Sequence, residues 1–336
     1  ILQSRSNCSV MTKSWYSLRA ILQKGHRAFF MKYCVVIPVF NSERIVGDTV
    51  EHTVAFFRGE GLAFEIILVN DGSTDRSWEI IRQKSKDHPE VVAINLLHNY
   101  GQHVANLCGF RHADGDYVIT MDDDLQNPPK EIAKLIAKAA EGHDLVIGQF
   151  KEKQHSLIRR LGSRVVSLIN RKVFHTPKRL AMTNFRIINK DVVQRVCRHR
   201  ASYLYIPGLV ILYSSNRANV VVDHQQRQIG SSNYNIWRIA KLVTEILFNY
   251  SSYPLRLVGG IGMIAAIVSF GLGAYYLGIA IFSGTSVPGW ATVVVLFSFI
   301  GGIILLMLGM IGEYLIRLIN QTSRAENFSI KEIVRE

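Results

Sequence analysis

In the stretch Tyr117-Val118-Ile119-Thr120-Met121-Asp122-Asp123-Asp124-Leu125-Gln126-Asn127-Pro128-Pro129, three consecutive acids directly follow an apolar run. A buried strand that ends in acids places their carboxylates at the C-terminal edge of a sheet, where open α/β proteins build their sites. Because like charges this close repel one another, we expect a cation to hold them together. A hard divalent ion with oxygen ligands fits this setting, and such ions commonly bridge phosphates to protein. The stretch therefore predicts an α/β fold with a metal–diphosphate site.

Strand and helix patterns alternate around this stretch, from residue 33 to about residue 150. Apolar, β-branched runs predict strands at 33–39, 65–70, 91–96, 116–121 and 144–149, and helices are predicted up to 58 and at 75–86, 101–112 and 129–141. This alternation predicts a mainly parallel, doubly wound sheet. Further strands are predicted at 183–188 and 219–223, and amphipathic helices at 155–174 and 235–250. The basic 155–174 segment is either a membrane-surface helix, or a pair of them, or an ordinary surface helix.

The region from Leu257 to Gly312 contains no Asp, Glu, Lys, Arg or His. At ~20 residues per span it is long enough for two transmembrane helices. We expect them near 256–282 and 290–315, with a polar turn between them; a buried helical hairpin is the alternative. Basic residues flank the pair and are absent from the turn, so the positive-inside rule places both flanks in the cytoplasm. These features predict an integral protein of the inner or plasma membrane.

The expected segments are an N-terminal extension at 1–31, an α/β domain at 32–232, a juxtamembrane amphipathic helix at 233–254, two spans at 255–316 and a cytoplasmic tail at 317–336. The extension is either a basic surface helix or sequence upstream of the true start. The formal net charge is +13, and no nucleic-acid-binding motif is present. The charge therefore favours the lipid bilayer and phosphorylated substrates as partners, and not nucleic acid. The four cysteines lack metal-ligand spacing and are expected to be reduced thiols.

Asp122, Asp124 and Gln126 alternate along the acidic loop, so three oxygen ligands can face one side of an extended segment. An EF-hand also begins with acids at this spacing. Its required glycine position is Asn127 here and its closing glutamate position is Ala133, which excludes an EF-hand. A solvated acidic turn is the remaining alternative to a metal site.

Three other polar motifs follow predicted strands or precede the predicted spans. They are Pro38-Val39-Phe40-Asn41-Ser42-Glu43, Asn70-Asp71-Gly72-Ser73-Thr74-Asp75 and Arg227-Gln228-Ile229-Gly230-Ser231-Ser232-Asn233-Tyr234. Each has an ordinary alternative: a helix cap, an Asx turn and a juxtamembrane linker. In the functional alternative, Asp71 accepts a hydrogen bond from a base N–H, and the arginine and hydroxyls of the third motif cover a diphosphate.

The order of these motifs resembles the polyprenyl-phosphate glycosyltransferases of glycosyltransferase family 2. Dolichol-phosphate mannose synthases and undecaprenyl-phosphate 4-deoxy-4-formamido-arabinose transferases belong to this group. The resemblance covers roughly residues 32–320. It rests on Pro38-x-x-Asn41-x-Glu43, Asn70-Asp71-Gly72-Ser73-x-Asp75, Asp122-x-Asp124-Leu125-Gln126-x-Pro128-Pro129, Phe185-Arg186, Arg227-x-x-Gly230-x-Ser232-x-Tyr234 and the two predicted spans.

The resemblance implies a GT-A fold and inverting transfer of a sugar from a nucleoside diphosphate, most often UDP, to a polyprenyl phosphate at the cytoplasmic face. It implies a nucleotide-sugar site made of Pro38, Asn41, Glu43, Asp71 and Asp123. It implies Mg²⁺ or Mn²⁺ on Asp122, Asp124 and Gln126, and catalytic roles for Asp122, Asp124 and Arg227. The acceptor and lid residues would be Arg186, Ser232 and Tyr234. A homo-oligomer is compatible with the small residues of the spans.

Three positions depart from the pattern of these transferases. Many relatives have aspartate where this chain has Asn184, lysine where it has Asn233, and arginine where it has His98. Two rival functions therefore stay open: a membrane polysaccharide synthase, and a nucleotide-sugar-binding membrane protein without turnover. A polysaccharide synthase usually needs more spans than the two expected here, and the departures are the only support for a non-catalytic protein.

Overall fold

The computed structural model describes residues 31–150, most of 166–225, 236–251, scattered positions from 253 to 282, 289–322 and 328–335. The chain divides into two compact units. The first contains residues 1–199, 204–234 and 325–336, and the second contains 200–203 and 235–324. The basic helix predicted at 155–174 and the first predicted span fall largely outside the described residues.

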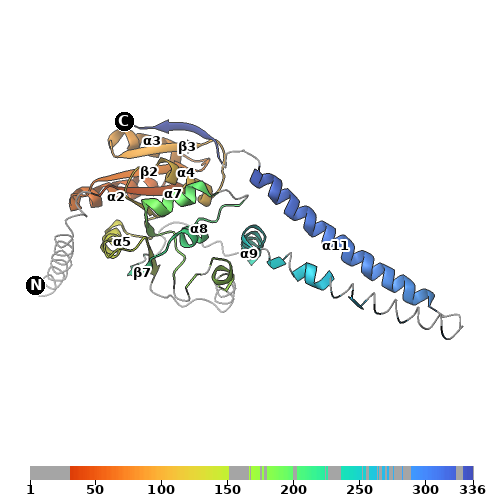
Figure 1. The fold of residues 1–336 in the computed structure, drawn as a ribbon. Helices are drawn as coiled ribbons and strands as arrows, with labels where there is room; N and C mark the ends of the chain where they lie inside the picture. Colours follow the sequence, from red (N-terminus) through yellow and green to blue (C-terminus); the bar gives the residue numbers. More distant parts are fainter. Residues whose placement is uncertain are drawn as a thin grey trace, which may run out of the picture. The chain divides into compact units, whose positions relative to one another are not determined.

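The first unit is built on one eight-stranded sheet with the order β7-β5-β6-β4-β1-β2-β3-β8 (Figure 1). The strands are β1 (Tyr33–Val39), β2 (Phe64–Asn70), β3 (Val91–Leu96), β4 (Tyr117–Thr120), β5 (Leu145–Phe150), β6 (Arg186–Asn189), β7 (Arg217–Val222) and β8 (Ile330–Val334). Five of them coincide closely with the strands predicted before residue 150. Their apolar runs are buried on both faces, as expected for central parallel strands.

The sheet is mixed, with a parallel centre and antiparallel additions. Strands β4, β1, β2 and β3 run parallel, which confirms the doubly wound core of the prediction. The prediction did not foresee that β6 inserts between β4 and β5 and runs antiparallel to both. The C-terminal end of β4 therefore meets the N-terminal end of β6, where Thr120 pairs with Arg186.

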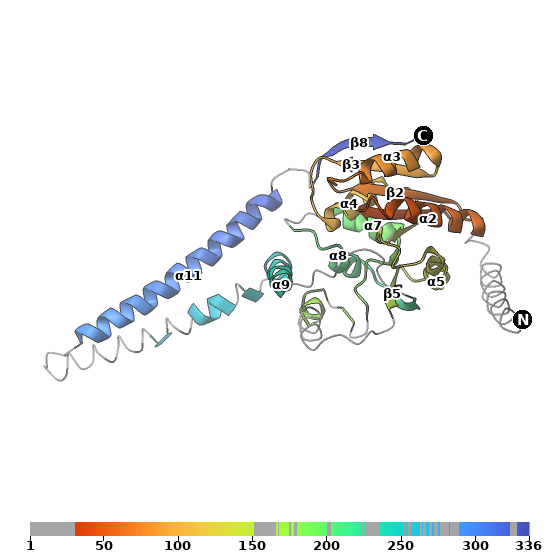
Figure 2. The same ribbon diagram turned by 180° about the vertical axis from the view of Figure 1, so that it is seen from behind.

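Helices cover both faces of this sheet (Figures 1 and 2). Helices α2 (Val46–Glu60), α3 (Ser77–Asp87) and α5 (Ile132–Ala139), with the 3₁₀ turn η2 (Pro129–Glu131), pack on one face. Helices α4 (Gln102–His112), α7 (Lys190–Arg198) and α8 (Ile206–Tyr213) gather on the other. The close approach of α4 requires a glycine, because a Cβ at Gly109 would lie 2.3 Å from Val36 Cγ1.

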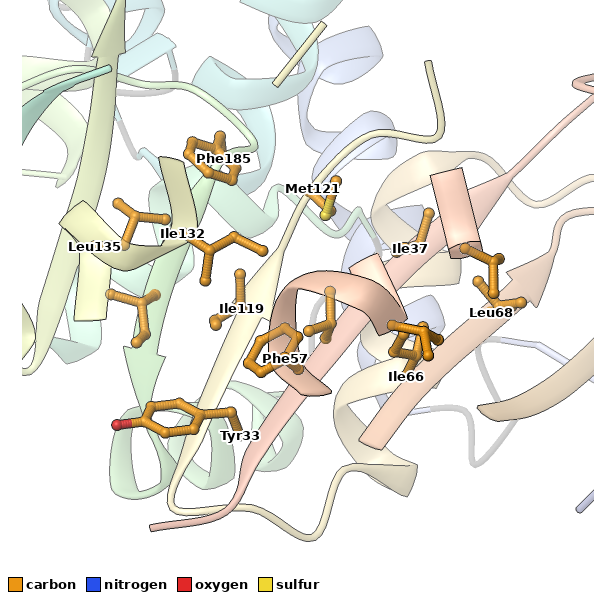
Figure 3. Packing of buried hydrophobic residues seen from close by; sticks show 14 of the residues in the cluster. Tyr33, Ile37, Phe57, Ile66, Leu68, Ile119, Met121, Ile132, Leu135 and Phe185 are labelled. Atoms are coloured by element: carbon orange, nitrogen blue, oxygen red, sulfur yellow. The ribbon is translucent and has the colours of Figure 1, made fainter. Parts of the chain in front are cut away.

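Figure 3 shows a hydrophobic core that lies beneath α2 and α5. Phe57 of α2 and Leu135 of α5 point onto the strands and are fully buried. Alternate strand residues complete the cluster: Ile37, Ile66, Leu68 and Ile119. Because successive strand residues point to opposite faces, this alternation fixes the register of each strand and holds its C-terminal end at a defined height.

The last strand, β8, is formed by the C-terminal segment and pairs antiparallel with β3 (Figure 2). Arg335 bonds to the buried carboxylate of Glu65 at 2.7 Å, and the Ser85 hydroxyl donates to the backbone oxygen of Val334 at 3.0 Å. The prediction for this region was a tail at 317–336, without a strand. The strand covers the edge of β3, which would otherwise present unpaired backbone groups.

The described helices of the second unit include α9 (Ile236–Tyr250) and α11 (Trp290–Thr322). The amphipathic helix predicted at 235–250 coincides with α9. None of the helices in the described part of the chain is both long enough and apolar enough to pass through a membrane. The predicted transmembrane hairpin is therefore not confirmed.

Candidate active site

The polar ends of several strands meet at one edge of the sheet. Strands β1, β2 and β4 are parallel neighbours, so the residues that follow Val39, Asn70 and Thr120 emerge at the same edge. Because β6 runs in the opposite direction, Asn184 precedes its first residue at this edge too. The topology thus gathers the motifs that the sequence placed after separate strands.

The loops after β1 and β2 brace each other through side chain to backbone hydrogen bonds. Asn41, which has a φ of 52°, accepts a bond from the Thr74 amide at 2.9 Å. Glu43 accepts from the Arg76 amide at 3.1 Å, and its own amide donates to Asp75 at 3.1 Å. Two of the predicted nucleotide residues therefore also hold this pair of loops in place.

A cavity of about 210 Å³ lies between these loops and the acidic loop. Its lining contains four of the predicted site residues, which are Asn41, Glu43, Asp123 and Asp124. Asp75 lines it as well. Asp75 belongs to the second motif but was not among the predicted site residues; its carboxylate accepts a bond from the Ser77 amide at 3.0 Å. Pro38 is different, because it lies within β1 opposite Val69 and is not part of the lining.

Asp123 and Asp124 present oxygen atoms that suit a hard cation. Burial raises the pKa of Asp123 to about 6, although a hydrogen bond from Ser42 opposes the shift. Among the described residues, no group hydrogen-bonds to the buried Oδ2 atom of Asp123. The neighbouring Asp124 accepts from the Gln126 amide at 3.1 Å, in a turn where Leu125 has a φ of 54°. A buried carboxylate with an unpaired oxygen fits a divalent cation, which prefers oxygen ligands.

Asp122 faces a different set of partners. Its Oδ1 atom accepts hydrogen bonds from Gln102 Nε2 at 2.6 Å and from Asn184 Nδ2 at 2.8 Å. Burial raises the pKa of Asp122; the bond from Asn184 opposes this shift and the charge of Asp124 adds to it. Asn184 stands out in the sequence only as a departure from relatives, and Gln102 was not among the predicted site residues. Gln102 lies 20 residues from Asp122, so no local pattern connects the two.

Arg186 is 1% exposed, which is rare for an arginine. Its Nε atom donates to Thr120 Oγ1 at 3.1 Å and its Nη2 atom donates to Asn184 Oδ1 at 3.1 Å. Burial lowers the pKa of Arg186 to about 10, against the attraction of Asp122. Within the described residues, the buried Nη1 atom has no hydrogen-bond acceptor. The predicted contact of Arg186 with an acceptor phosphate stays a prediction.

Asp71 is 3% exposed and binds backbone amides of the next loop. Its two carboxylate oxygens accept from Tyr100 N at 2.7 Å and from Gly101 N at 2.9 Å. Burial raises the pKa of Asp71, and these two bonds oppose the shift. Gly101 has a φ of 91° and directly precedes α4. Asp71 therefore fixes the start of the helix that carries Gln102.

The structure gives fewer contacts for Gln126 and describes none of the three predicted lid residues. The backbone oxygen of Gln126 accepts from the Gln225 amide at 2.9 Å. Arg227, Ser232 and Tyr234, the predicted lid, lie outside the described residues, as does Asn233. In the described ranges, no three His, Cys, Asp or Glu side chains are grouped so that they could hold a metal ion. The oxygen atoms of the acidic loop and of the Gln126 side chain stay the predicted ligands.

The buried ring of His103, the second residue of α4, makes the stability of this region depend on pH. Burial lowers the pKa of His103 to about 4, and the positive charge of Arg186 adds to the shift. Its ring contacts Tyr205 edge-on, with a centroid distance of 5.5 Å. Since an unfolded histidine titrates near pH 6.5, folding keeps this ring neutral, and stability is full above pH 6.5 and falls between pH 6.5 and 4.

We expect His103→Phe, which keeps the aromatic contact without the titration, to remove part of this acid-side loss. The shift corresponds to about 3 kcal/mol at pH 4. Apparent melting temperatures of wild type and variant, measured from pH 8 to pH 4, check the expectation. Parallel curves for the two proteins across this window would contradict it.

Comparison with known proteins defines the class. The solved structure of glucosyl-3-phosphoglycerate synthase from Mycobacterium tuberculosis with Mn²⁺, UDP and phosphoglyceric acid has a TM-score of 0.50 and 15% identity, over 69% of this chain and 79% of that one. A complex of the same enzyme with Mn²⁺, UDP-glucose and phosphoglyceric acid also has a TM-score of 0.50, at 14% identity, over 69% and 80% of the two chains. This likeness shows the fold, a mixed GT-A sheet.

The family is defined by sequence. The model of glycosyl transferase family 2 matches residues 34–196. The undecaprenyl-phosphate 4-deoxy-4-formamido-L-arabinose transferase of Salmonella paratyphi A is 32% identical over 314 residues, which are 90% of this chain and 94% of that protein. The corresponding transferase of Salmonella newport has the same identity and coverage. The chain belongs to glycosyltransferase family 2, which confirms the resemblance seen in its motifs.

Proposed function

We propose that this protein transfers a sugar from a nucleoside diphosphate to a polyprenyl phosphate at a membrane surface. The observation that carries the proposal is the similarity to undecaprenyl-phosphate sugar transferases along nearly the full length of the chain. A cavity of about 210 Å³ between the acidic loop and the first two loops supports it, because carboxylates and amides converge there. UDP is the favoured donor nucleotide, as in the solved complexes of the structural neighbour.

In this proposal the donor lies along the edge where β1, β2 and β4 end. Asn41, Glu43 and Asp123 line the cavity and bind the nucleotide sugar. Pro38 shapes the end of β1. Asp71 acts through the loop that it holds, because both of its oxygens already accept backbone amides. A second acceptor position on each oxygen remains for a base N–H, since a carboxylate offers about four lone-pair sites.

Asp122, Asp124 and Gln126 would hold Mg²⁺ or Mn²⁺ in this arrangement. Asp123 Oδ2, which is buried without a hydrogen-bond partner among the described residues, supports a cation at the acidic loop, and so does the burial that raises the pKa of Asp123 to about 6. When bound, the ion supplies charge neutralisation of the diphosphate as a Lewis acid. The carboxylates therefore orient the leaving group, and Arg227 adds a positive charge beside it.

The acceptor is a phosphate monoester that is ionised near neutral pH, so its oxygen needs no strong general base. Attack by that oxygen on the anomeric carbon, in line with the departing diphosphate, forms the new glycosidic bond, breaks the old one and inverts the carbon. Ser232 and Tyr234 close over the two phosphates in this scheme, and Arg186 contributes positive charge on the acceptor side. Asn184 is compatible with it because no base is required there.

The lipid acceptor places the reaction at a bilayer, with the first unit on its cytoplasmic side. The charge-free region from Leu257 to Gly312 and its basic flanks support a membrane anchor of two spans. Small residues in this region leave room for close helix contacts, so a homo-oligomer is part of the proposal.

Purified full-length protein, a short polyprenyl phosphate, MgCl₂ or MnCl₂ and a panel of radiolabelled nucleotide sugars test the function. We expect one sugar to appear in the lipid phase, and to do so only when the divalent cation is present. Label in a water-soluble polymer would instead indicate a polysaccharide synthase. Donor binding without any transfer across the panel would indicate a non-catalytic binding protein.

A further inference from the structure

Two neutral amides from distant parts of the chain hold one carboxylate of the acidic loop. We propose that Asn184 and Gln102 are positioning residues: together they fix Oδ1 of Asp122, which leaves its other oxygen for a divalent cation, and Asn184 also connects this carboxylate to the buried charge of Arg186. The inference rests on the proposed function, because it concerns how Asp122 is presented to the cation.

The geometry supports a fixed carboxylate. Gln102 Nε2 and Asn184 Nδ2 lie 2.6 and 2.8 Å from the same oxygen of Asp122. Among the described residues, no group hydrogen-bonds to the second oxygen. Because two donors on one oxygen restrict rotation of the carboxylate, the second oxygen keeps one direction. Loss of a side chain that orients a metal ligand in this way typically weakens metal binding by roughly 10–100-fold.

Asn184 has a second contact that explains why an amide suits this position. Its Oδ1 atom accepts from Arg186 Nη2 at 3.1 Å while its Nδ2 atom donates to Asp122. A direct, two-pronged Arg186–Asp122 pair would occupy both carboxylate oxygens. The Asn184 amide between them connects the guanidinium to the carboxylate while occupying only one carboxylate oxygen. Arg186 Nη1 has no acceptor within the described residues, so the neighbouring side chains neutralise the guanidinium charge only in part.

Strand pairing and backbone hydrogen bonds hold Asn184 and Gln102 next to Asp122. Asn184 and Arg186 flank the start of β6, and Arg186 pairs with Thr120 in the strand that precedes Asp122. The Thr120 hydroxyl donates to the backbone oxygen of Asn184 at 2.5 Å, which holds the backbone there. Gln102 is brought to the same point by Asp71, which binds the amide of Gly101 at 2.9 Å. Two strands and one helix therefore converge on Asp122.

The test replaces each amide by leucine, which has a similar size and no hydrogen-bonding group. We expect Asn184→Leu and Gln102→Leu to weaken the binding of Mn²⁺ to the full-length protein by roughly 10–100-fold, as measured by electron paramagnetic resonance without any sugar donor. Gln102 is exposed, so its variant is expected to fold even if Asn184→Leu does not. Because both residues act on one oxygen, the double variant should lose less than the product of the two single losses.

Asn189→Ala serves as the matched control. Asn189 ends β6 at the opposite edge and accepts from the Asp191 amide at 2.9 Å as the cap of α7, so its loss lowers stability without reaching Asp122. We expect this control to bind Mn²⁺ as wild type does. Wild-type affinity in Gln102→Leu and in any folded Asn184 variant, alongside wild-type protein that binds Mn²⁺ and transfers sugar, overturns the positioning role alone. Wild-type protein that neither binds Mn²⁺ nor transfers sugar overturns the proposed function as well.

Discussion

Replacement of Asp124 by alanine is expected to reduce sugar transfer by at least roughly 10³-fold. The carboxylate lines the cavity beside Asp123 and is a predicted ligand of the divalent cation. Charge neutralisation by such an ion contributes several kcal/mol to a transition state, and a loss of about 4 kcal/mol is a factor of about 10³ in rate. Transfer of radiolabelled sugar into the lipid phase, measured in single-turnover reactions, gives the ratio directly.

The fold should survive this change, because the bond that Asp124 accepts from the Gln126 amide lies within the acidic loop itself. The matched control is Asp114→Ala, which removes an exposed carboxylate paired with Lys190 at 3.2 Å. We expect the control to transfer sugar at the wild-type rate. Transfer at the wild-type rate by Asp124→Ala would remove the cation from the proposed scheme.

Replacement of Asp71 by alanine is expected to have the largest effect on stability. Two backbone amides, Tyr100 N and Gly101 N, lose a charged acceptor that is 3% exposed. Each unpaired group costs about 1–3 kcal/mol, so we expect a total loss of about 2–6 kcal/mol. In a unit of this size the loss corresponds to a decrease of roughly 4–24 °C in apparent melting temperature. Circular dichroism during heating measures it.

The same variant should weaken donor binding at least roughly tenfold, because the loop before α4 loses its anchor. Asp144→Ala provides the comparison. Asp144 also accepts backbone amides, from Ser215 at 2.7 Å and Asn216 at 2.9 Å, but these bonds are exposed and lie before the start of β5, at the sheet edge opposite the one where β1, β2 and β4 end. We expect a smaller loss of stability and unchanged donor affinity there. Equal effects of the two variants on donor binding would contradict the role of Asp71.

The parallel half of the fold could be predicted because its signals are local. Strands β1 and β3 have the predicted bounds, since apolar β-branched runs ended by polar residues are typical of buried strands. Helices α7 and α8 and strand β8 were missed. Strand β8 is short and alternates exposed and half-buried residues, and its partner β3 lies more than two hundred residues earlier. Nothing local distinguishes such an edge strand from a tail.

The sequence could predict that the strand-end motifs converge, but not the contacts that depend on how the strands are ordered. Asn41, Glu43, Asp123 and Asp124 meet around one cavity, as the strand-end argument requires. The partners of Asp122 were not foreseen, because Asn184 reaches it only through the antiparallel insertion of β6. The role of Arg186 was likewise read from its motif, and its near-complete burial became visible only in the packed sheet.

Strand β8 also constrains how the chain is threaded. The backbone leaves the first unit after Tyr234 and rejoins its sheet through the segment that begins at Ala325. Because the chain leaves the folded first unit and returns to the same unit, the segment between must cross any membrane an even number of times. With one or three crossings, β8 would lie on the other side of the membrane from β3 and could not pair with it. The β3–β8 strand pair therefore requires an even number of crossings in the segment between these points, independently of hydropathy or flanking charge.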